Sequence, residues 1–334
     1  MQAMVLTQTA DIHTGPLKLQ EVGDPVPGPG EVRLRVRCCA ICRTDLHVIE
    51  GDLPETKRPV IPGHQIVGIV EALGEGCCRF RIGQRIGVAW LRQTCGRCRF
   101  CLSGRENLCA GQRFTGYHAD GGYAEQAVVP EAFAYEIPEA FDDEAATPLL
   151  CAGIIGYRAL SRSRLPERGR LAIFGFGSSA HIVIQIARHR GCEVFVVTRG
   201  EGHRRLAREM GAVWTGEDAN EMPAKVDSAI LFAPVGELVP PALRVLDRGG
   251  TLAVAGIHLT DIPVLDYERD LFYERDLRSV TANTRDDGRG LLAEAAEIPI
   301  RPHITAYPLA EANRALQDLK DDRINGTGVL VMPS

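Results

Sequence analysis

The sequence predicts an α/β protein with two domains, a mostly β domain and a doubly wound parallel sheet. Two observations favour this fold class. Short apolar segments broken by prolines and glycines fill the first 150 residues, and from Leu171 onward strand-like and helix-like segments alternate. The length of 334 residues also suits two domains of ordinary size.

The mostly β part is indicated by alternating apolar residues and by turn-forming residues. Residues 32–36 alternate between apolar and polar side chains, and residues 66–73 form a second apolar run. Prolines and glycines at 25–30 interrupt the chain. This patterning is typical of a compact domain built from short strands.

The second part has a strand, helix, strand rhythm, which predicts parallel strands joined by right-handed crossovers. The expected strands are 171–174, 193–197, 229–232 and 252–255, and the expected helices are 181–190 and 204–210. After about Asn283 the pattern is mixed again, with a helix near 309–319 and a closing strand at 329–332.

Charge and composition exclude several classes of function. The chain has 38 basic and 43 acidic residues, a net charge of −5, so it lacks the basic field that nucleic acid binding requires. No run of 18 apolar residues predicts a membrane span, and residues 1–20 lack a signal-peptide layout, which together predict a cytoplasmic protein. In that reducing compartment the 11 cysteines are expected to have metal or redox roles rather than to form disulfides.

Four cysteines form the strongest local motif of the sequence. Cys95, Cys98, Cys101 and Cys109 lie on one short segment, spaced as in sites where four thiolates bind a structural zinc ion. An iron–sulfur cluster is the less favoured alternative, because its usual final spacing and following proline are absent. Unrelated reduced cysteines are the remaining alternative.

A second candidate metal site is dispersed along the chain. Cys42, His64 and Cys151 offer two thiolates and one imidazole, the ligand set of a catalytic zinc ion with an open fourth position. Their spacing alone does not establish a site, because isolated cysteines and histidines are more often found in a core or on a surface.

A glycine-rich segment predicts dinucleotide binding. Gly175, Phe176, Gly177, Ser178 and Ser179 follow an expected strand and open an expected helix, the context that the dinucleotide fingerprint requires. The glycines allow a tight turn and a close approach of the pyrophosphate to the helix N-terminus.

The end of the next strand bears on which dinucleotide is bound. NAD enzymes place an acidic residue there to accept a hydrogen bond from the ribose 2′-hydroxyl, whereas this chain has Thr198 and Arg199. The absent carboxylate and the added cation favour NADP over NAD. The alternative is that these are ordinary solvated side chains at the start of a helix.

Four segments occur in the order found in zinc-dependent alcohol dehydrogenases of the medium-chain dehydrogenase/reductase superfamily: Cys42–His47, Gly63–His64, Cys95–Cys109 and Leu150–Gly153. The chain resembles this family over nearly its whole length, and its microbial, yeast-like branch most closely. The resemblance implies a GroES-like catalytic domain at residues 1–149 and 285–334, with a structural zinc lobe at 95–109. It also implies a Rossmann dinucleotide-binding domain at residues 150–284.

The resemblance implies two zinc ions per chain, one structural and one catalytic. Cys42, His64 and Cys151 would bind the catalytic ion, and the Asp45 carboxylate would orient His64. In this chemistry zinc polarises the substrate oxygen and the nicotinamide carries the hydride.

The resemblance also implies a path for the proton of the substrate alcohol. Thr44 would hold the substrate oxygen and pass the proton through the cofactor ribose to His47, while Arg43 would contact the pyrophosphate. The chain departs from the family in two places. Gln65 replaces the usual glutamate after the histidine ligand, and residues 325–328 lack an arginine that yeast-like members place against the pyrophosphate.

The implied substrate pocket contains Ile49, Leu53, Trp90 and Tyr117, which would form an apolar slot for a primary alcohol or aldehyde of modest size. The sequence thus predicts an alcohol dehydrogenase or aldehyde reductase that uses zinc and NADP(H), assembled as a homo-oligomer, a dimer or tetramer. Alternatives are an NAD-dependent member of the family, a zinc-free medium-chain quinone or enoyl reductase, and a zinc-ribbon binding module. Metal content discriminates the zinc enzyme from the last two.

Overall fold

The computed structural model describes residues 1–298 and 300–333, and its contacts divide the chain into two compact units. The first unit comprises Met1–Cys151, Asn283–Ala296 and Pro302–Ser334. The second comprises Ala152–Ala282 and Glu297–Arg301. A short return of the chain to the second unit, at Glu297–Arg301, was not part of the division expected from the sequence.

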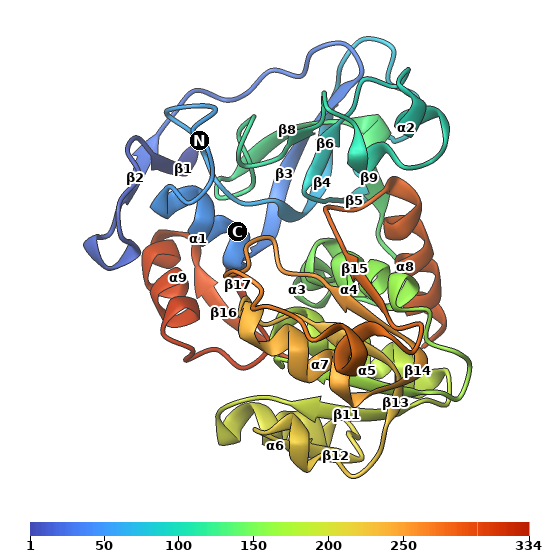
Figure 1. Cartoon of the computed structure of the whole chain (residues 1–334). Coiled ribbons are helices and arrows are strands. Elements are labelled where there is room, and N and C mark those ends of the chain that lie inside the picture. The colour runs from blue at the N-terminus through green and yellow to red at the C-terminus, as the bar shows by residue number, and fades with distance from the viewer. Residues whose placement is uncertain (299, 334) are drawn as a thin grey trace. The chain divides into compact units, whose positions relative to one another are not determined.

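The first unit is built on a seven-stranded sheet with the strand order β16-β17-β3-β4-β5-β9, with β8 beside β3 (Figure 1). Its strands are β3 (Glu31–Ala40), β4 (Gln65–Leu73), β5 (Arg85–Val88), β8 (Gln126–Pro130), β9 (Ala134–Glu136), β16 (Ile304–Pro308) and β17 (Thr327–Val331). Two small sheets pair β1 (Gln2–Leu6) with β2 (Leu17–Glu21), and β6 (Leu91–Gln93) with β7 (Arg113–Phe114).

The helices of the first unit lie between strands along the chain, and most of them are short. They are α1 (Arg43–Glu50), α2 (Arg99–Leu102), α3 (Asp143–Ala146), α8 (Arg285–Glu297) and α9 (Ala312–Lys320), of which α8 ends in the second unit. Helix α1 is amphipathic: Leu46 and Ile49 are buried in the core of this unit, together with residues of β1, β3 and β4.

The second unit is a six-stranded, wholly parallel sheet in the order β12-β11-β10-β13-β14-β15. Its strands are β10 (Arg170–Phe174), β11 (Glu193–Val197), β12 (Trp214–Gly216), β13 (Val226–Leu231), β14 (Leu246–Val254) and β15 (Asp276–Ser279). This order, 3-2-1-4-5-6 in chain sequence, is that of doubly wound dinucleotide-binding folds. The structure therefore confirms the predicted fold class.

Helices cover the parallel sheet and explain why its strands are nearly continuous apolar runs. They are α4 (Ala152–Ser163), α5 (Ser178–His189), α6 (Glu201–Glu209) and α7 (Val239–Val245). Ala172 and Phe174 of β10 share a buried cluster with α7. Leu171 and Ile173 are also buried and, by strand alternation, point to the opposite face. Both faces of the sheet are thus buried.

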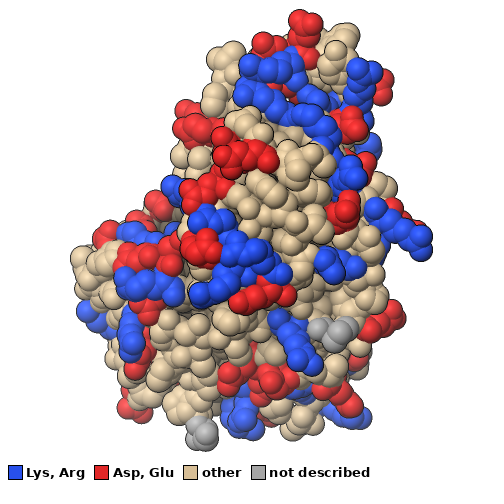
Figure 2. Space-filling view, turned by 90° about the horizontal axis from the view of Figure 1, so that it is seen from below, with Lys and Arg blue, Asp and Glu red and all other residues tan. Residues whose placement is uncertain are grey.

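No helix in the described part of the chain is long and apolar enough to cross a lipid bilayer. On the face shown in Figure 2, basic and acidic side chains are interspersed, and most basic groups lie next to acidic ones. This distribution agrees with the near balance of charges in the sequence.

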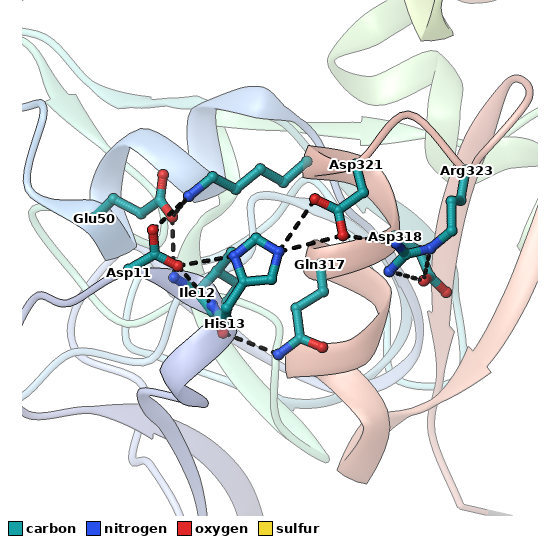
Figure 3. A network of polar contacts seen from close by, with 9 residues as sticks. Asp11, Ile12, His13, Glu50, Gln317, Asp318, Asp321 and Arg323 are labelled. Atoms are coloured by element: carbon teal, nitrogen blue, oxygen red, sulfur yellow. Dashed lines mark hydrogen bonds and ion pairs between the residues drawn. The ribbon is translucent and has the colours of Figure 1, made fainter.

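A polar network joins the start of the first unit to the end of α9 (Figure 3). His13 lies between two carboxylates, with Nδ1 2.9 Å from Asp11 Oδ1 and Nε2 3.1 Å from Asp321 Oδ1. Lys320 Nζ donates to Asp11 Oδ2 at 2.8 Å and to Glu50 Oε1 at 2.7 Å. Because Glu50 ends α1, the network connects that helix to α9.

We expect the His13→Gln variant to lose part of the pH dependence of thermal stability. Hydrogen bonds with Asp11 and then Asp321 raise the pKa of His13. Protonated His13 therefore contributes fully to folding stability below pH ~6.5, and this contribution disappears as the pH rises through the raised pKa. The network is exposed, so the expected change in melting temperature is small, about 1 °C. Melting curves of wild type and variant at pH 6 and pH 8.5 measure this change. The control is His189→Gln, because His189 is exposed at the end of α5. An equal pH dependence in the His13 and His189 variants would contradict the prediction.

Candidate active site and metal centres

The first candidate metal centre is built around the start of α1. Cys42 is the N-cap of this helix, and Asp45, three residues later, accepts a hydrogen bond from the Cys42 backbone N–H with Oδ2 at 2.9 Å. The other carboxylate oxygen, Oδ1, lies 3.1 Å from His64 Nδ1. One buried carboxylate therefore holds both the backbone of Cys42 and the ring of His64.

The structure brings Cys42, His64 and Cys151 together, all within the first unit. Their candidate ligand atoms lie within 4.8 Å of one another. His64 is in the loop before β4, and Cys151 follows the short 3₁₀ helix Thr147–Leu150. Cys42 Sγ lies 3.5 Å from His64 Nε2, close to the ~3.6 Å expected for a sulfur and a nitrogen bound tetrahedrally to one zinc ion.

The electrostatics of this cluster suit a cation. The Cys151 thiol and burial raise the pKa of Cys42 well above its usual range. Burial lowers the pKa of His64, but the negative charge of Asp45 and the hydrogen bonds with Asp45 and Cys42 outweigh it and raise this pKa to about 10. The groups that stabilise a proton on His64 also attract a metal ion. The donor set therefore fits a zinc ion in place of that proton.

Aromatic side chains lie beside the three candidate ligands. The ring of Trp90 is edge-on to His64, with ring centroids 4.9 Å apart. Trp90 also stacks on Phe114 at 4.6 Å and on Tyr117 at 5.8 Å. His118 packs against Tyr117 at 4.6 Å. The sequence predicted Trp90 and Tyr117 for the pocket but gave no signal for Phe114 and His118, whose place depends on the β6–β7 hairpin.

The two other predicted pocket residues differ in exposure. Leu53 is half-buried just after α1, whereas Ile49 is fully buried in the core of the first unit. A role of Ile49 in substrate contact stays a prediction.

The predicted proton path begins on the first turn of α1. Thr44 is buried and precedes Asp45, while Arg43, at the first helical position, is exposed. His47 lies one turn further on, and its Nδ1 is 2.8 Å from Asp52 Oδ2. Asp52 was missed by sequence reasoning because it lies beyond the helix end, where no spacing rule applies.

Gln65, the departure from the usual glutamate, is fully buried at the start of β4, where it pairs with Ala40 of β3. The position next to His64 is thus occupied by an uncharged side chain in the interior of the first unit.

The second candidate metal centre is the four-cysteine lobe. Cys95, Cys98, Cys101 and Cys109 have their sulfurs within 4.8 Å of one another. Cys98 and Cys101 sulfurs are 3.5 Å apart, and those of Cys95 and Cys101 are 3.9 Å apart. Four thiolates bound tetrahedrally at ~2.3 Å from zinc have sulfurs ~3.8 Å apart. The donor set therefore fits a closed structural site.

Backbone N–H groups around the lobe stabilise thiolates. The amides of Arg97 and Cys98 lower the pKa of Cys95 to about 6. The amides of Cys95 and Gly111 donate to Cys109 Sγ at 3.4 Å and 3.3 Å, but burial and the Cys95 and Cys101 side chains outweigh them and raise the pKa of Cys109 to about 11. Amide hydrogen bonds of this kind favour the deprotonated form that binds metal.

A buried ion pair anchors the four-cysteine lobe to α8. The Glu106 carboxylate accepts from the backbone N–H of Arg285 at 3.0 Å and from its Nε at 3.1 Å, and Glu106 is almost fully buried. Arg285 is the first residue of α8, so Glu106 satisfies a free amide at that helix end. The two residues are 179 positions apart, and no pattern in the sequence predicts the contact.

In the second unit, the glycine-rich segment connects β10 to α5 as predicted. Gly175 has a φ of +86°, and a Cβ there would lie 3.0 Å from the Ala233 backbone nitrogen, so glycine suits this turn. Phe176 is buried, which leaves its backbone rather than its ring for a ligand. Gly177 is the N-cap of α5, and a Cβ there would meet open space. Ser178 and Ser179 begin the helix, so the segment presents a helix N-terminus with room for a pyrophosphate.

The arginines after β11 differ in whether they form ion pairs with carboxylates. Thr198 is buried at the strand end, and Arg199 is exposed beside it. Arg204 contacts both Glu201 and Glu217, and Arg208 also contacts Glu201. Within the described residues, Arg199 has no carboxylate partner.

Comparisons with known proteins bear on what these sites do. A family model described as "Alcohol dehydrogenase GroES-like domain" matches residues 28–139, and one described as "Zinc-binding dehydrogenase" matches residues 180–297. The probable alcohol dehydrogenase AdhA of Mycobacterium tuberculosis (strain CDC 1551 / Oshkosh) is 50% identical over 99% of this chain and 97% of its own. The chain belongs to the zinc-dependent alcohol dehydrogenases of the medium-chain dehydrogenase/reductase superfamily.

Solved structures agree with this membership. The dehydrogenase is similar to a thermostable alcohol dehydrogenase from Pyrobaculum aerophilum with bound cobalt and zinc, with a TM-score of 0.89, 28% identity and 99% of each chain covered. It is also similar to a zinc-binding dehydrogenase from Sinorhizobium meliloti 1021 bound to NADP, with a TM-score of 0.86, 30% identity and 99% and 98% of the chains covered.

Family membership confirms the predicted GroES-like and Rossmann folds and identifies the chain as an oxidoreductase, an alcohol dehydrogenase acting on small molecules. The zinc-ribbon binding module considered from the cysteine motif is therefore excluded as the function of this chain.

Proposed function

We propose that the dehydrogenase interconverts primary alcohols and aldehydes with zinc held by Cys42, His64 and Cys151 and with NADP(H) as the hydride carrier. The arrangement of these three donors carries the proposal. Among the described residues the cluster holds three thiol or imidazole donors and no fourth, as a catalytic zinc site with an open position requires. A zinc ion bound there supplies Lewis acidity toward the substrate oxygen.

The chain's own residues would orient the metal ligands and move the proton. Asp45 accepts from His64 Nδ1, which leaves the Nε2 lone pair directed at the metal position. Thr44, on the first turn of the same helix, would hold the substrate hydroxyl and accept or release its proton. His47, bound to Asp52, would exchange that proton with solvent.

NADP is favoured over NAD by the charges after β11. Arg204 and Arg208 are already paired with glutamates, whereas Arg199 is exposed and without a carboxylate partner in the described chain. A guanidinium in this position suits a 2′-phosphate, and the uncharged Thr198 does not repel that phosphate. The Sinorhizobium meliloti neighbour, which is bound to NADP, supports the same assignment.

Two zinc ions per chain are proposed, the second in the four-cysteine lobe. The sulfur separations there support a closed tetrahedral site, and the Pyrobaculum aerophilum neighbour contains cobalt and zinc. The buried pair of Glu106 and Arg285 would keep this lobe attached to α8 when the ion is bound.

The substrate assignment rests on the aromatic side chains near His64. Trp90 and Tyr117, together with Leu53, would narrow the approach to the metal and favour slender primary alcohols. A pocket of this kind discriminates by only about 1–3 kcal/mol per methylene, so a range of alcohols is expected.

A panel of short, branched, aromatic and allylic alcohols, each assayed with NADP and with NAD, tests the proposed reaction by the absorbance of the reduced nicotinamide. Parallel assays with the corresponding aldehydes and reduced cofactors give the opposite direction. We expect turnover of primary alcohols with NADP and loss of turnover after incubation with a chelator, with two zinc ions per chain before it. Chelator-resistant turnover by protein shown to be metal-free would contradict the zinc assignment and favour a zinc-free reductase. The cytoplasmic location inferred from the sequence stays a prediction.

The second unit carries the surface that we propose for self-association. β15 is an open edge of the parallel sheet, and exposed apolar residues precede it or lie on it. These residues are Ile257, Ile262, Val264, Tyr267, Phe272, Tyr273 and Leu277. Such an apolar patch beside an unpaired strand edge is typical of a protein–protein interface.

We expect the wild type to elute as a dimer or tetramer in size-exclusion chromatography with light scattering. Val264→Asp, at a side chain 97% exposed in the single chain, should increase the monomer fraction at micromolar concentration, because a buried charge disfavours the interface. Val26→Asp, at a side chain 83% exposed in the first unit, is the matched control and should leave the mass unchanged. A monomeric wild type, or an effect of Val26→Asp equal to that of Val264→Asp, would count against this surface.

A further inference from the structure

Residues 54–63, which directly precede the candidate ligand His64, are hydrogen-bonded to residues 117–123 in the first unit. In the inner part of this pair, residues 121–123 donate main-chain hydrogen bonds of 2.7 to 3.0 Å to the carbonyl oxygens of residues 61–63. The three residues that accept these bonds are all buried. The inner part is therefore fixed by buried main-chain contacts.

The outer part of the pair, residues 54–57, is attached by side chains instead. Thr56 Oγ1 donates to the backbone oxygen of Tyr117 at 2.7 Å. The Tyr117 hydroxyl in turn donates to the backbone oxygen of Pro54. Two hydroxyl groups, one on each segment, thus fasten the outer part to Tyr117.

The other contacts of residues 54–57 are weaker. Lys57 forms an ion pair with Asp120, but both side chains are exposed, so the pair contributes little. The first three residues of this loop are exposed, and a segment with little buried apolar surface opens locally at a low cost in free energy. Arg58 Nη2 donates to a backbone oxygen of α1 at 3.2 Å and fixes the point where the loop ends. The two hydroxyl bonds are therefore the contacts that decide whether the loop opens.

The Tyr117 ring connects this loop to the candidate metal centre. It stacks on Trp90 with ring centroids 5.8 Å apart, and Trp90 is edge-on to His64 at 4.9 Å. Leu53, which is half-buried, directly precedes the loop. Of the side chains proposed to narrow the approach to the metal, Tyr117 is therefore bonded to the loop and Leu53 is its neighbour along the chain.

We infer that Thr56 is a positioning residue, which together with the Tyr117 hydroxyl fastens residues 54–57 beside the Trp90–Tyr117 stack and thereby sets the width of the approach to the metal. The inference rests on the proposed alcohol dehydrogenase function. With both bonds made, Leu53 and Tyr117 are held at a fixed separation, which favours slender primary alcohols. With either bond lost, the loop opens more often and branched alcohols are admitted. Thr56 thus acts on substrate selectivity and not on the chemistry at the metal.

The first test measures selectivity in two variants. Thr56→Val removes one hydroxyl and nearly keeps the side-chain shape, and Tyr117→Phe removes the other hydroxyl and keeps the ring. The loss of one hydrogen bond shifts a local opening equilibrium by about 2- to 10-fold. We therefore expect the ratio of kcat/KM for neopentyl alcohol to that for 1-butanol to rise by about 2- to 10-fold in each variant. In Thr56→Val the change should lie mainly in the KM of the branched alcohol rather than in its kcat.

A second measurement follows the loop without turnover. Trypsin cleavage at the Lys57–Arg58 bond of the folded protein is timed, and the fragments are identified by mass spectrometry. When opening and closing are fast relative to cleavage, the cleavage rate reports the population of the open loop. We expect this rate to rise by about 2- to 10-fold in both variants. Tyr117→Phe leaves the sequence around the cleaved bond unchanged, so its effect cannot come from the preference of the protease.

Two control variants separate the hydroxyl contact from other effects. Thr56→Ser keeps the hydroxyl and should match the wild type in both measurements. Thr14→Val removes a threonine hydroxyl of the first unit that also donates to a backbone oxygen at 2.7 Å, that of Asp11. It should change neither the alcohol ratio nor the cleavage at Lys57.

An unchanged alcohol ratio in Thr56→Val, with or without faster cleavage, would overturn the selectivity role and leave the proposed reaction intact. An equal effect in Thr56→Ser or Thr14→Val would also overturn it, since the hydroxyl contact with Tyr117 would not be the cause. A wild type that oxidises no alcohol would overturn the proposed function and the selectivity role together. The cleavage rates would in that case still show whether the two hydroxyls hold the loop.

Discussion

Replacing Cys151 with serine should remove one zinc ion per chain and lower kcat/KM for alcohol oxidation by about 10³-fold or more. A serine hydroxyl does not replace a thiolate ligand at neutral pH, so the remaining Cys42 and His64 would hold the ion weakly. Lewis-acid stabilisation of the transition state contributes several kcal/mol, and each 1.36 kcal/mol corresponds to a tenfold change in rate. Zinc content by elemental analysis and steady-state rates with NADP measure the two effects together.

Cys192→Ser is the control for this variant. Cys192 is a buried thiol of the second unit whose Sγ donates to Pro166 O at 3.6 Å, and it belongs to neither candidate metal centre. It should keep both metal ions and the wild-type rate. A Cys151→Ser protein with two zinc ions and undiminished turnover would contradict the assignment of the catalytic site.

The double variant Thr198→Asp/Arg199→Gly should change the preferred cofactor from NADP to NAD. A carboxylate at the end of β11 accepts from the ribose 2′-hydroxyl of NAD and repels the 2′-phosphate of NADP. Loss of the Arg199 guanidinium removes a charge-assisted hydrogen bond worth about 1.5–3 kcal/mol. We therefore expect the ratio of kcat/KM for NADP to that for NAD to fall by about 10²-fold or more.

Arg205→Ala is the matched control, because Arg205 is an exposed arginine of α6 that faces Glu209 at 3.9 Å. Its removal should leave the cofactor ratio within about twofold of the wild-type value. The NADP assignment would be wrong if the wild type preferred NAD, and an unchanged ratio in the double variant would exclude Thr198 and Arg199 as its determinants.

The parts of this fold that the sequence predicted are those encoded by local pattern. The strands β10, β11 and β13 and the helices α5 and α6 lie where apolar periodicity placed them, within a few residues. The edge strands β12 and β15 were not predicted, since both are short and only partly apolar. Pairing with β11 and β14 gives them their strand conformation, and pairing is a property of the sheet.

The candidate site likewise contains some contacts that local spacing predicts and others that depend on tertiary packing. Cys95, Cys98 and Cys101 are close together because their spacing on one loop leaves little choice. Asp52 beside His47, and Phe114 beside Trp90, depend instead on how a helix end and a hairpin pack. No spacing rule predicts such contacts, because the direction of a side chain after a turn is decided by its neighbours.

The amino-acid sequence by itself determined the order of the ligand-bearing motifs, the four-cysteine loop and the glycine-rich turn, because each is a short-range pattern. The tertiary structure alone decided that Cys42 and His64, 22 positions apart, share one carboxylate. It also decided that Glu106 accepts a hydrogen bond from the backbone of the first residue of α8. The physical reason is that a buried charge must find its partners within hydrogen-bond distance, and only packing of distant segments brings those partners there.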